Sequence, residues 1–438
     1  TRTIHTLVFP SMMKPILKVI SQGCAANFGE GEKIARILQD NYQISFGQPQ
    51  RKTDPQSIEV VTEIDTYVLN VCTVKGNATA IKLIREAKEI SPNAKIIITG
   101  CAPKDLREQV TKQFDGIQFS SLKEIEKTFA NEASLQHASN KLRESETTGI
   151  VNIEEGCLDA CAYCSTHLVK GRLKSFKADW IVRQVEQLVG DGCKEIQLTG
   201  QDCGCYGFDI GTNLAELVKQ ILVKVPGDYK LRLGMGNPRH VLKYRESLIE
   251  CFYDSHVYKF LHLPVQSGSE NVLKAMNRRH TVKDFMDLAA EFNNRFNLFT
   301  LSTDLIVGFP GETETDFEDT LNVLRETRPT VCNITRFVSR PGTPAEKLTQ
   351  IVPDAIKHKR SSILSETFQQ IAVENNRYWI GQNEDVVLEK EGYHKGSFIA
   401  RNDAYRPVAI TFSPSATVPP RGTKLSVQIT DAEAFALI

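Results

Sequence analysis

The stretch EEGCLDACAYCSTH, residues 154–167, carries three closely spaced cysteines, Cys157, Cys161 and Cys164. Thiols this dense usually hold a soft metal centre. A closed structural zinc site takes four protein ligands, whereas this loop offers three. A [4Fe–4S] cluster on three cysteines keeps one iron open for a substrate or a cofactor. We therefore predict an iron–sulfur centre on this loop, because cysteines that only fill a core seldom cluster in this way.

Composition limits the other possibilities. The 438 residues suffice for two to four domains, and 53 basic and 53 acidic residues leave no net charge to attract a polyanion. The 11 cysteines are odd in number and bunched in motifs, which argues against a disulfide framework and for a reducing, cytoplasmic compartment. No apolar run of about 18 residues is present, so we expect no membrane partner.

Strands and helices alternate along residues 16–133. Apolar, β-branched segments such as IDTYVLNVCT and AKIIITGCA alternate with amphipathic stretches, which predicts a doubly wound parallel α/β domain. We expect residues 1–15 to be a disordered leader or residues added to the natural protein. The polar stretch 134–148 is predicted to be a linker.

Three further cysteines, Cys24, Cys72 and Cys101, each lie at the carboxyl end of a predicted strand of this first domain. Such ends meet at one edge of a parallel sheet, where ligands bind. We therefore expect a second three-cysteine metal site, although a single cysteine there could also be a small buried residue. No GxGxxG fingerprint follows the first strand, which argues against a nicotinamide domain.

Residues 149–352 contain six further predicted strand–helix units, which fit a partial (β/α)6 barrel. The strand ends carry glycine and polar residues, as a polar cofactor requires: LTGQD, GMGNP, PVQSGS and DLIVGFPGET. Residues 353–378 read as one connecting helix. Alternating strands over 379–438 predict a small antiparallel β-barrel of the oligonucleotide-binding kind. Its charge is balanced, with seven basic and seven acidic residues from Asn376 to Ile438.

The motifs GCLDACAYC, LTGQD, RLGMGNP, HLPVQSGS, MNRRHT, STDLIVGFPGET and SRPGTPA occur in this order. In that order, and with the upstream cysteines and the β-rich tail, the chain resembles the methylthiotransferase family of radical S-adenosylmethionine enzymes from about Ile16 onward. The contexts GCLDACAYC, GQD…YGFDIGTNL and RLGMGNP are similar to the archaeal and eukaryotic branch. That branch acts on N6-threonylcarbamoyladenosine beside the tRNA anticodon.

The resemblance implies an enzyme with two [4Fe–4S] clusters. The cluster on Cys157, Cys161 and Cys164 would bind S-adenosylmethionine and generate a deoxyadenosyl radical that removes hydrogen from C2 of the adenine. The cluster on the three upstream cysteines would deliver sulfur, and a second S-adenosylmethionine the methyl group. The tail would be the TRAM domain, which binds RNA. Expected partners are the tRNA anticodon stem-loop, an electron donor of the flavodoxin or ferredoxin type, and a sulfur source.

Individual cofactor contacts are less well defined by the sequence. Gln201, Asp202, Gln266 and Asp304 lie at strand ends, where they either bond S-adenosylmethionine or cap helices and loops. The backbone around Tyr163 would meet the adenine, while its side chain could simply pack. We expect Cys203 and Cys205, which depart from the family pattern, not to be ligands. Cysteines 193, 251 and 332 are expected to be buried, as is a satisfied His262.

Basic side chains are the candidates for RNA contacts. In the central domain these are Arg278, Arg279 and the groups around Arg336, Arg340 and residues 357–360; in the tail they are Lys395, Arg401 and Arg406, with Tyr393 and Tyr405 as stacking platforms. The alternatives are solvated helix faces and ordinary barrel packing.

Three other functions remain open at this stage. Two are family members that modify isopentenyl-adenosine in tRNA or an aspartate of a ribosomal protein. The third, from a different class, is an iron–sulfur electron-transfer or RNA-binding scaffold protein. A six-unit barrel with cofactor-facing strand ends argues against this last function, because electron transfer alone needs no such cavity.

Overall fold

The computed structural model describes residues 14–48, 64–72, 75–130, 142–392, 394, 396–413 and 415–438. The chain divides into two compact units, Thr1–Glu144 and Ser145–Ile438. Most of the predicted leader, much of the predicted linker, and both Tyr393 and Lys395 lie outside the described residues.

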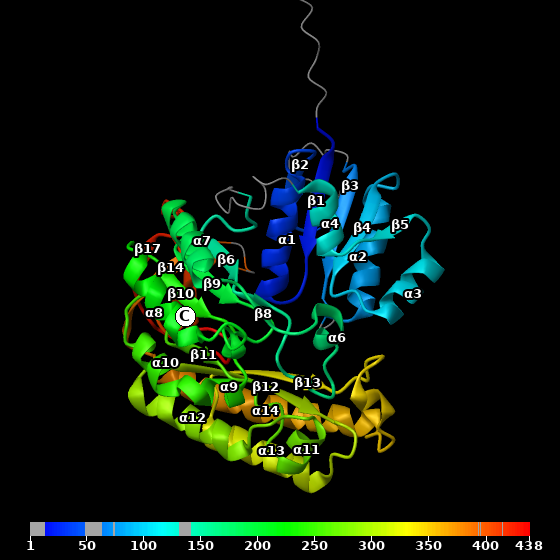
Figure 1. Ribbon diagram of the computed structural model, residues 1–438. Helices are drawn as coiled ribbons and strands as arrows, with labels where there is room; N and C mark the ends of the chain where they lie inside the picture. Colours follow the sequence, from blue (N-terminus) through cyan, green and yellow to red (C-terminus); the bar gives the residue numbers. More distant parts are fainter. Residues whose placement is uncertain are drawn as a thin grey trace, which may run out of the picture. The chain divides into compact units, whose positions relative to one another are not determined.

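The first unit is built on a parallel sheet in the order β2-β1-β3-β4-β5 (Figure 1). The strands are β1 (Ile16–Ser21), β2 (Gln43–Phe46), β3 (Thr66–Val71), β4 (Lys95–Gly100) and β5 (Ile117–Phe119). The helices are α1 (Ala25–Leu38), α2 (Asn77–Ile90), α3 (Lys104–Gln113) and α4 (Leu122–Phe129). Every residue of β3 is buried, as expected for a central strand covered on both faces.

The two faces of this sheet carry separate cores. One joins Leu17 and Val68 to Ile34 of α1 and Ile125 of α4, and the other joins strand residues to α2 and α3. The predicted doubly wound arrangement is therefore confirmed. Strands β2 and β5 were not predicted, because segments of three or four residues give no clear periodicity. Helix α4, with eight residues, was not predicted either.

The second unit contains six parallel strands that follow one another in chain order. They are β6 (Thr148–Asn152), β9 (Glu195–Thr199), β10 (Lys230–Leu233), β11 (Phe260–His262), β12 (Thr300–Val307) and β13 (Val331–Arg336). Two three-stranded sheets, β6-β9-β10 and β11-β12-β13, share them. A bridge between Leu231 and Val257 links these sheets, and the Gly236 amide donates to the His262 carbonyl oxygen at 3.0 Å. The strands thus form the open barrel expected from the sequence.

Helices cover the outside of this barrel (Figure 1). They are α7 (Ala178–Gly190), α8 (Leu214–Lys224), α10 (Arg245–Phe252), α11 (Glu270–Ala275), α12 (Val282–Arg295) and α13 (Glu314–Thr327). Two begin with capping boxes, in which Thr281 and Thr313 bond the backbone three residues on and the acid there bonds back. The apolar faces of α7, α8, α10, α12 and α13 join the strands in one large core.

Helix α14 (Asp354–Arg377) leads into a four-stranded antiparallel sheet in the order β16-β15-β14-β17. Its strands are β14 (Asn383–Glu391), β15 (Ser397–Asn402), β16 (Pro407–Thr411) and β17 (Lys424–Gln428). Inward residues such as Val386, Leu388 and Ala400 form a small core of their own. The predicted antiparallel β-rich tail is confirmed.

The turn between β15 and β16, residues 403–406, lies against the amino-terminal ends of the barrel strands. The Tyr405 hydroxyl donates to Glu195 Oε1 at the start of β9 (2.9 Å), and the Lys259 amide donates to the Asp403 carbonyl oxygen just before β11 (2.9 Å). Arg406 Nη1 donates to the Thr330 carbonyl oxygen before β13 (3.3 Å). This turn therefore covers the end of the barrel opposite to the end that carries the cysteine loop.

None of the helices in the described ranges has both the length and the apolar character needed to cross a bilayer.

Candidate functional site

The three cysteines of residues 154–167 lie on a loop between two short paired strands, β7 (Glu154–Glu155) and β8 (Lys174–Ser175), just beyond the carboxyl end of β6. All three are half-buried free thiols. Each sulfur accepts one N–H group: Cys157 from the Asp159 amide (3.4 Å), Cys164 from the Thr166 amide (3.4 Å), and Cys161 from Arg278 Nη1 (3.7 Å). Donors of this kind stabilise thiolates, so the loop suits a thiophilic metal centre.

Gly156 lets this loop approach the strand that returns from it. Its φ is +84°, and a Cβ there would lie 2.6 Å from the carbonyl carbon of Arg172. Only glycine fits this position without strain. The Cys157 amide then donates to the Gly171 carbonyl oxygen (3.3 Å), and the Gly156 amide donates to Gln201 Oε1 (2.7 Å). Gln201, a predicted cofactor contact, therefore supports the loop from β9.

Asp159, inside the loop, is bound by the start of helix α9 (Pro238–Val241). Its Oδ2 accepts from Asn237 Nδ2 (2.6 Å) and lies 3.0 Å from His240 Nε2, while its Oδ1 accepts from Arg239 Nη1 (2.5 Å). Burial alone would raise the pKa of Asp159, but His240 and Arg239 outweigh it and lower that pKa. The prediction from sequence missed these four residues. The acid inside the cysteine motif and the GNPRH segment at a strand end were the available signals.

The segment after helix α11 holds the next part of the loop. The Ala162 amide donates to the Met276 carbonyl oxygen (2.9 Å), and Asn277 Nδ2 donates to the Ala160 carbonyl oxygen (2.7 Å). Arg278 follows, with Nη2 donating to the Pro264 carbonyl oxygen (2.6 Å). The guanidinium group of Arg278 faces the cysteine loop, and its predicted RNA contact stays a prediction.

Asp202 caps the turn that carries the two additional cysteines, Cys203 and Cys205. Its Oδ1 accepts from the amides of Gly204 (3.1 Å) and Asn237 (2.9 Å), and burial raises its pKa. Of the two readings offered for Asp202, a ligand contact or a cap, the structure therefore shows the cap. Both cysteines are fully buried, and Cys205 Sγ donates to the Asp202 carbonyl oxygen at 3.2 Å.

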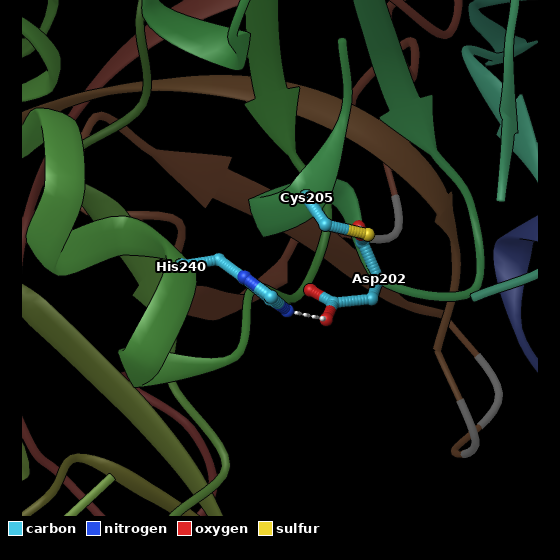
Figure 2. A group of neighbouring side chains, drawn as sticks. All are labelled: Asp202, Cys205 and His240. Carbon is cyan, nitrogen blue, oxygen red and sulfur yellow. Dashed lines mark hydrogen bonds and ion pairs between the residues drawn. The ribbon is translucent and has the colours of Figure 1, made fainter. Parts of the chain in front are cut away.

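Asp202, Cys205 and His240 come together in Figure 2, with potential ligand atoms within 4.8 Å of one another. Each already has protein partners, since His240 Nε2 is bonded to Asp159 and Asp202 Oδ1 accepts two amides. The group therefore reads as a hydrogen-bonded support of the loop. Glu154, in β7, accepts from the Asp202 amide at its Oε1 (2.9 Å). Burial and the nearby charge of Asp202 raise the pKa of Glu154 to about 8.

Two predicted contact residues, Asp304 in β12 and Gln266 after the end of β11, lie near each other, because Gln266 forms a bridge with Leu305. Asp304 Oδ1 accepts from Asn333 Nδ2 (2.7 Å) and is 3.0 Å from His262 Nε2, which makes His262 the satisfied histidine expected. Burial alone would raise the pKa of Asp304, but these hydrogen bonds lower it. Gln266 has a φ of +76°, unusual for a residue with a side chain. Strain of this kind gathers at ligand sites, so Gln266 stays a predicted contact.

Tyr163, before the last cysteine, packs against the small core formed by Ala162, Met276 and Phe309, among others. Burial raises its pKa well above the usual value. Its side chain therefore packs, as one of the two readings expected, and the role of its backbone stays a prediction.

The basic residues predicted to bind RNA differ in their solvent exposure and in their protein partners. Arg406 is only 2% exposed and donates to Asn376 Oδ1 (2.7 Å), so the prediction that it contacts RNA is wrong. Arg401 binds both carboxylate oxygens of Glu389 and stacks 4.1 Å from the ring centre of Tyr405, and its RNA contact stays a prediction. Arg279 is exposed and stays a prediction.

Two other basic residues are also paired with protein groups. Arg360 is buried against Glu312 (2.8 Å), and Arg336 is hydrogen-bonded to His358. Tyr405 packs against Tyr258 and Phe260 of the barrel, at ring separations of 4.8 and 4.9 Å. It is thus a packing residue and not an RNA platform.

In the first unit, Cys24 begins α1 after β1, Cys72 directly follows β3, and Cys101 directly follows β4. These three strands are neighbours in the sheet, so their ends meet at one edge as predicted. A Cβ at Gly23, whose φ is +101°, would lie 2.5 Å from Cys72 Sγ. The absence of a side chain at Gly23 therefore lets the loop that carries Cys24 approach Cys72.

Asn27 ties these strand ends together. Its Nδ2 lies within hydrogen-bonding distance of the carbonyl oxygens of Gln22 (2.7 Å), Asn70 (2.9 Å) and Val71 (3.2 Å). The Cys101 amide donates to the Val71 carbonyl oxygen at 2.9 Å. Each cysteine therefore stands on a loop that is fixed by hydrogen bonds, as a metal site requires.

Comparison with known proteins agrees with this layout. The model of the Radical SAM superfamily matches residues 151–324, and that of Uncharacterized protein family UPF0004 matches residues 17–120. A relative from Pyrococcus abyssi, named probable threonylcarbamoyladenosine tRNA methylthiotransferase, is 37% identical over 411 residues, covering 90% of this chain and 93% of its own. The human threonylcarbamoyladenosine tRNA methylthiotransferase is 32% identical over 418 residues, 90% of this chain and 69% of its own.

Two solved structures share the fold. One is the radical S-adenosylmethionine methyltransferase TsrM from Kitasatospora setae, with a TM-score of 0.53, 11% identity, and coverage of 82% of this chain and 89% of its own. The other is the cobalamin-dependent S-adenosylmethionine radical enzyme OxsB, with a TM-score of 0.51, 13% identity, and coverage of 82% and 56%.

Proposed function

The chain belongs to the threonylcarbamoyladenosine tRNA methylthiotransferase family, and on that premise we propose its reaction and its site residues. It inserts sulfur at C2 of N6-threonylcarbamoyladenosine beside the tRNA anticodon and then methylates that sulfur. The choice of nucleoside rests on the names of relatives that are up to 37% identical over 90% of the chain. With tRNA as substrate, we expect the enzyme in the cytoplasm.

The observation that carries the chemistry is the cysteine loop, where each of three sulfurs accepts an N–H group. Three thiolates with fixed donors fit a [4Fe–4S] cluster with one open iron. When bound, this cluster supplies one electron and a coordination site to S-adenosylmethionine. The protein's part is to orient and to exclude water. Asp304 in β12 and Gln266, which forms a bridge with Leu305 of the same strand, are our candidates to orient S-adenosylmethionine.

The second site, on Cys24, Cys72 and Cys101, is proposed to hold a second [4Fe–4S] cluster that delivers sulfur. Its support is the convergence of the three strand ends and the close approach of Gly23 to Cys72. An electron donor of the flavodoxin or ferredoxin type and a sulfur source complete the reaction.

The C-terminal antiparallel sheet is proposed to be the TRAM domain, which contacts tRNA. Burial of Arg406 and the packing of Tyr405 against Tyr258 argue against that role for these two residues. Exposed basic side chains such as Arg279 remain candidates to bind phosphates. Lys395 is a further prediction.

Anaerobic reconstitution with iron and sulfide, followed by dithionite and S-adenosylmethionine, tests the radical chemistry. We expect 5′-deoxyadenosine from the wild-type chain and none from Cys161→Ala. Cys193→Ala is the matched control, since Cys193 is buried in the hydrophobic core of the same unit. Absence of deoxyadenosine from a wild-type chain that has taken up iron would exclude the radical function.

The substrate is tested by mass spectrometry of tRNA nucleosides from a deletion strain complemented with this gene. We expect the methylthio derivative of threonylcarbamoyladenosine to return. Its continued absence, or a methylthio group on isopentenyl-adenosine or on a ribosomal protein, would refute the substrate assignment. Cys72→Ala should keep deoxyadenosine formation and lose sulfur insertion; full sulfur insertion would remove the second cluster from the mechanism.

A further inference from the structure

The hydrogen bonds to the three sulfurs of the cysteine loop do not all come from the same kind of donor. Cys157 and Cys164 each accept the backbone amide two residues further along the chain, from Asp159 and Thr166. Cys161 instead accepts from the side chain of Arg278, which is 117 residues away in the sequence. The loop therefore obtains its third donor, and with it a positive charge, from outside the motif.

Several contacts fix the guanidinium of Arg278 in this position. Nη2 donates to the Pro264 carbonyl oxygen at 2.6 Å, and Nε is enclosed without a partner. The preceding Asn277 adopts a φ of +57°, a left-handed conformation that asparagine tolerates, and it bonds the Ala160 carbonyl oxygen. Rotation of Arg278 away from Cys161 would therefore break a backbone hydrogen bond as well.

The nearby carboxylates are already engaged with other groups. Asp159 is paired with Arg239 and His240, and Asp202 accepts two backbone amides. Among the residues that the structure describes, no carboxylate is hydrogen-bonded to Arg278, so its charge acts directly on the sulfur that it contacts. Hydrogen bonds and positive charge at a cluster sulfur favour the more negative, reduced state and so raise the reduction potential.

We propose that Arg278 is a positioning residue that raises the reduction potential of the cluster on Cys157, Cys161 and Cys164 through its N–H bond to Cys161. This inference rests on the proposed assignment of a [4Fe–4S] cluster to the loop. It gives a role to a residue whose charge, in the sequence, resembled an RNA contact.

The test is a redox titration of the full-length chain, followed by electron paramagnetic resonance of the reduced cluster. Cys24, Cys72 and Cys101 are replaced by alanine in all samples, so that one cluster is observed. Arg278→Gln removes the charge, and Arg278→Lys keeps the charge with a shorter side chain. Arg406→Lys is the matched control, a buried arginine at the opposite end of the barrel that makes hydrogen bonds only to protein groups.

We expect Arg278→Gln to lower the ratio of reduced to oxidised cluster at a fixed potential at least tenfold, which for a one-electron couple corresponds to about 59 mV. Arg278→Lys should lie between Arg278→Gln and the parent, and Arg406→Lys should match the parent. If the glutamine variant takes up no iron, the lysine variant decides. Equal potentials in the parent and in the Arg278 variants that load iron would overturn the inference, while a parent that takes up no cluster would overturn the proposed function itself.

Discussion

Replacing Tyr405 separates a structural role from an RNA-binding role for the C-terminal sheet. Its hydroxyl donates to Glu195 Oε1 at 2.9 Å, and its ring lies between Tyr258, Phe260 and the guanidinium of Arg401. Tyr405→Phe removes only the hydroxyl, and Glu195 Oε1 then keeps the hydrogen bond from Gln197 Nε2 (2.6 Å). Tyr405→Ala removes the ring as well. Tyr405 has a φ of +59°, and neither replacement is glycine, so a change in backbone freedom does not complicate the comparison.

The magnitudes follow from these contacts. Loss of a hydrogen bond to a carboxylate costs about 1.5–3 kcal/mol, so Tyr405→Phe should destabilise the second unit by about 2 kcal/mol. Loss of a packed aromatic ring costs about 3–5 kcal/mol. In units of this size, 1 kcal/mol corresponds to roughly 2–4 °C in Tm. We therefore expect Tm to fall by about 4–8 °C for Tyr405→Phe and by roughly twice that for Tyr405→Ala.

The assays are thermal unfolding by circular dichroism and binding of an anticodon stem-loop RNA at 20 °C, where all variants are folded. If Tyr405 only packs, both variants lose Tm and neither loses RNA affinity. A base stacked on the ring would instead make Tyr405→Ala lose about 1–3 kcal/mol of RNA affinity and leave Tyr405→Phe unaffected. That second pattern, with an unchanged Tm for Tyr405→Phe, would refute the packing role. Tyr378→Phe is the control, since Tyr378 is 67% exposed.

Three further changes test the cysteine loop and its support. Gly156→Ala places a Cβ against Arg172 at a positive φ, so we expect iron uptake after reconstitution to fall at least severalfold; normal uptake would show that the loop tolerates a side chain there. The folded-state pKa of Glu154 is about 8, above its ordinary value of 4.5, so its contribution to stability is full below pH 4.5 and is lost as the pH rises through 8. Glu154→Gln should therefore raise Tm at pH 9 and leave it unchanged at pH 5. At pH 9 the free energy of unfolding should rise by up to about 5 kcal/mol. An equal change at both pH values would contradict this. Cys205→Ser keeps a donor to the Asp202 carbonyl oxygen, so iron per chain should be unchanged, whereas a loss of iron would make Cys205 a ligand.

The sequence predicted the first sheet because its central strands are rich in apolar and β-branched residues. The segment Thr66–Val71, buried at every position, could form only a central strand, and its end located Cys72 at the sheet edge. The same reasoning located Cys24 and Cys101. Short elements such as Ile117–Phe119 escaped prediction, because three residues carry too little pattern.

Charged residues were the least predictable part, because their burial depends on partners far along the chain. Arg406 is buried through Asn376 and Thr330, which lie 30 and 76 residues away. Arg278 reaches Cys161 across 117 residues of sequence, and the local sequence does not specify this partner. Asp159 lies within the cysteine motif itself, yet its partners on α9 are 78–81 residues downstream. In each case the residue type was visible and the partner was not.

The long-range support of the cysteine loop has a consequence for biosynthesis. Asp159 meets its partners only after Asn237–His240 have been made, and Ala160–Ala162 only after Met276–Arg278. At the usual speed of translation, the 117 residues between Cys161 and Arg278 take roughly 6–23 s to synthesise. During that interval the three thiols belong to a chain in which Met276–Arg278, the segment that bonds the loop, has not yet been synthesised. Iron and sulfide that reach the chain in this interval would meet a loop without these supports, so the contacts favour cluster insertion after Arg278 has been made.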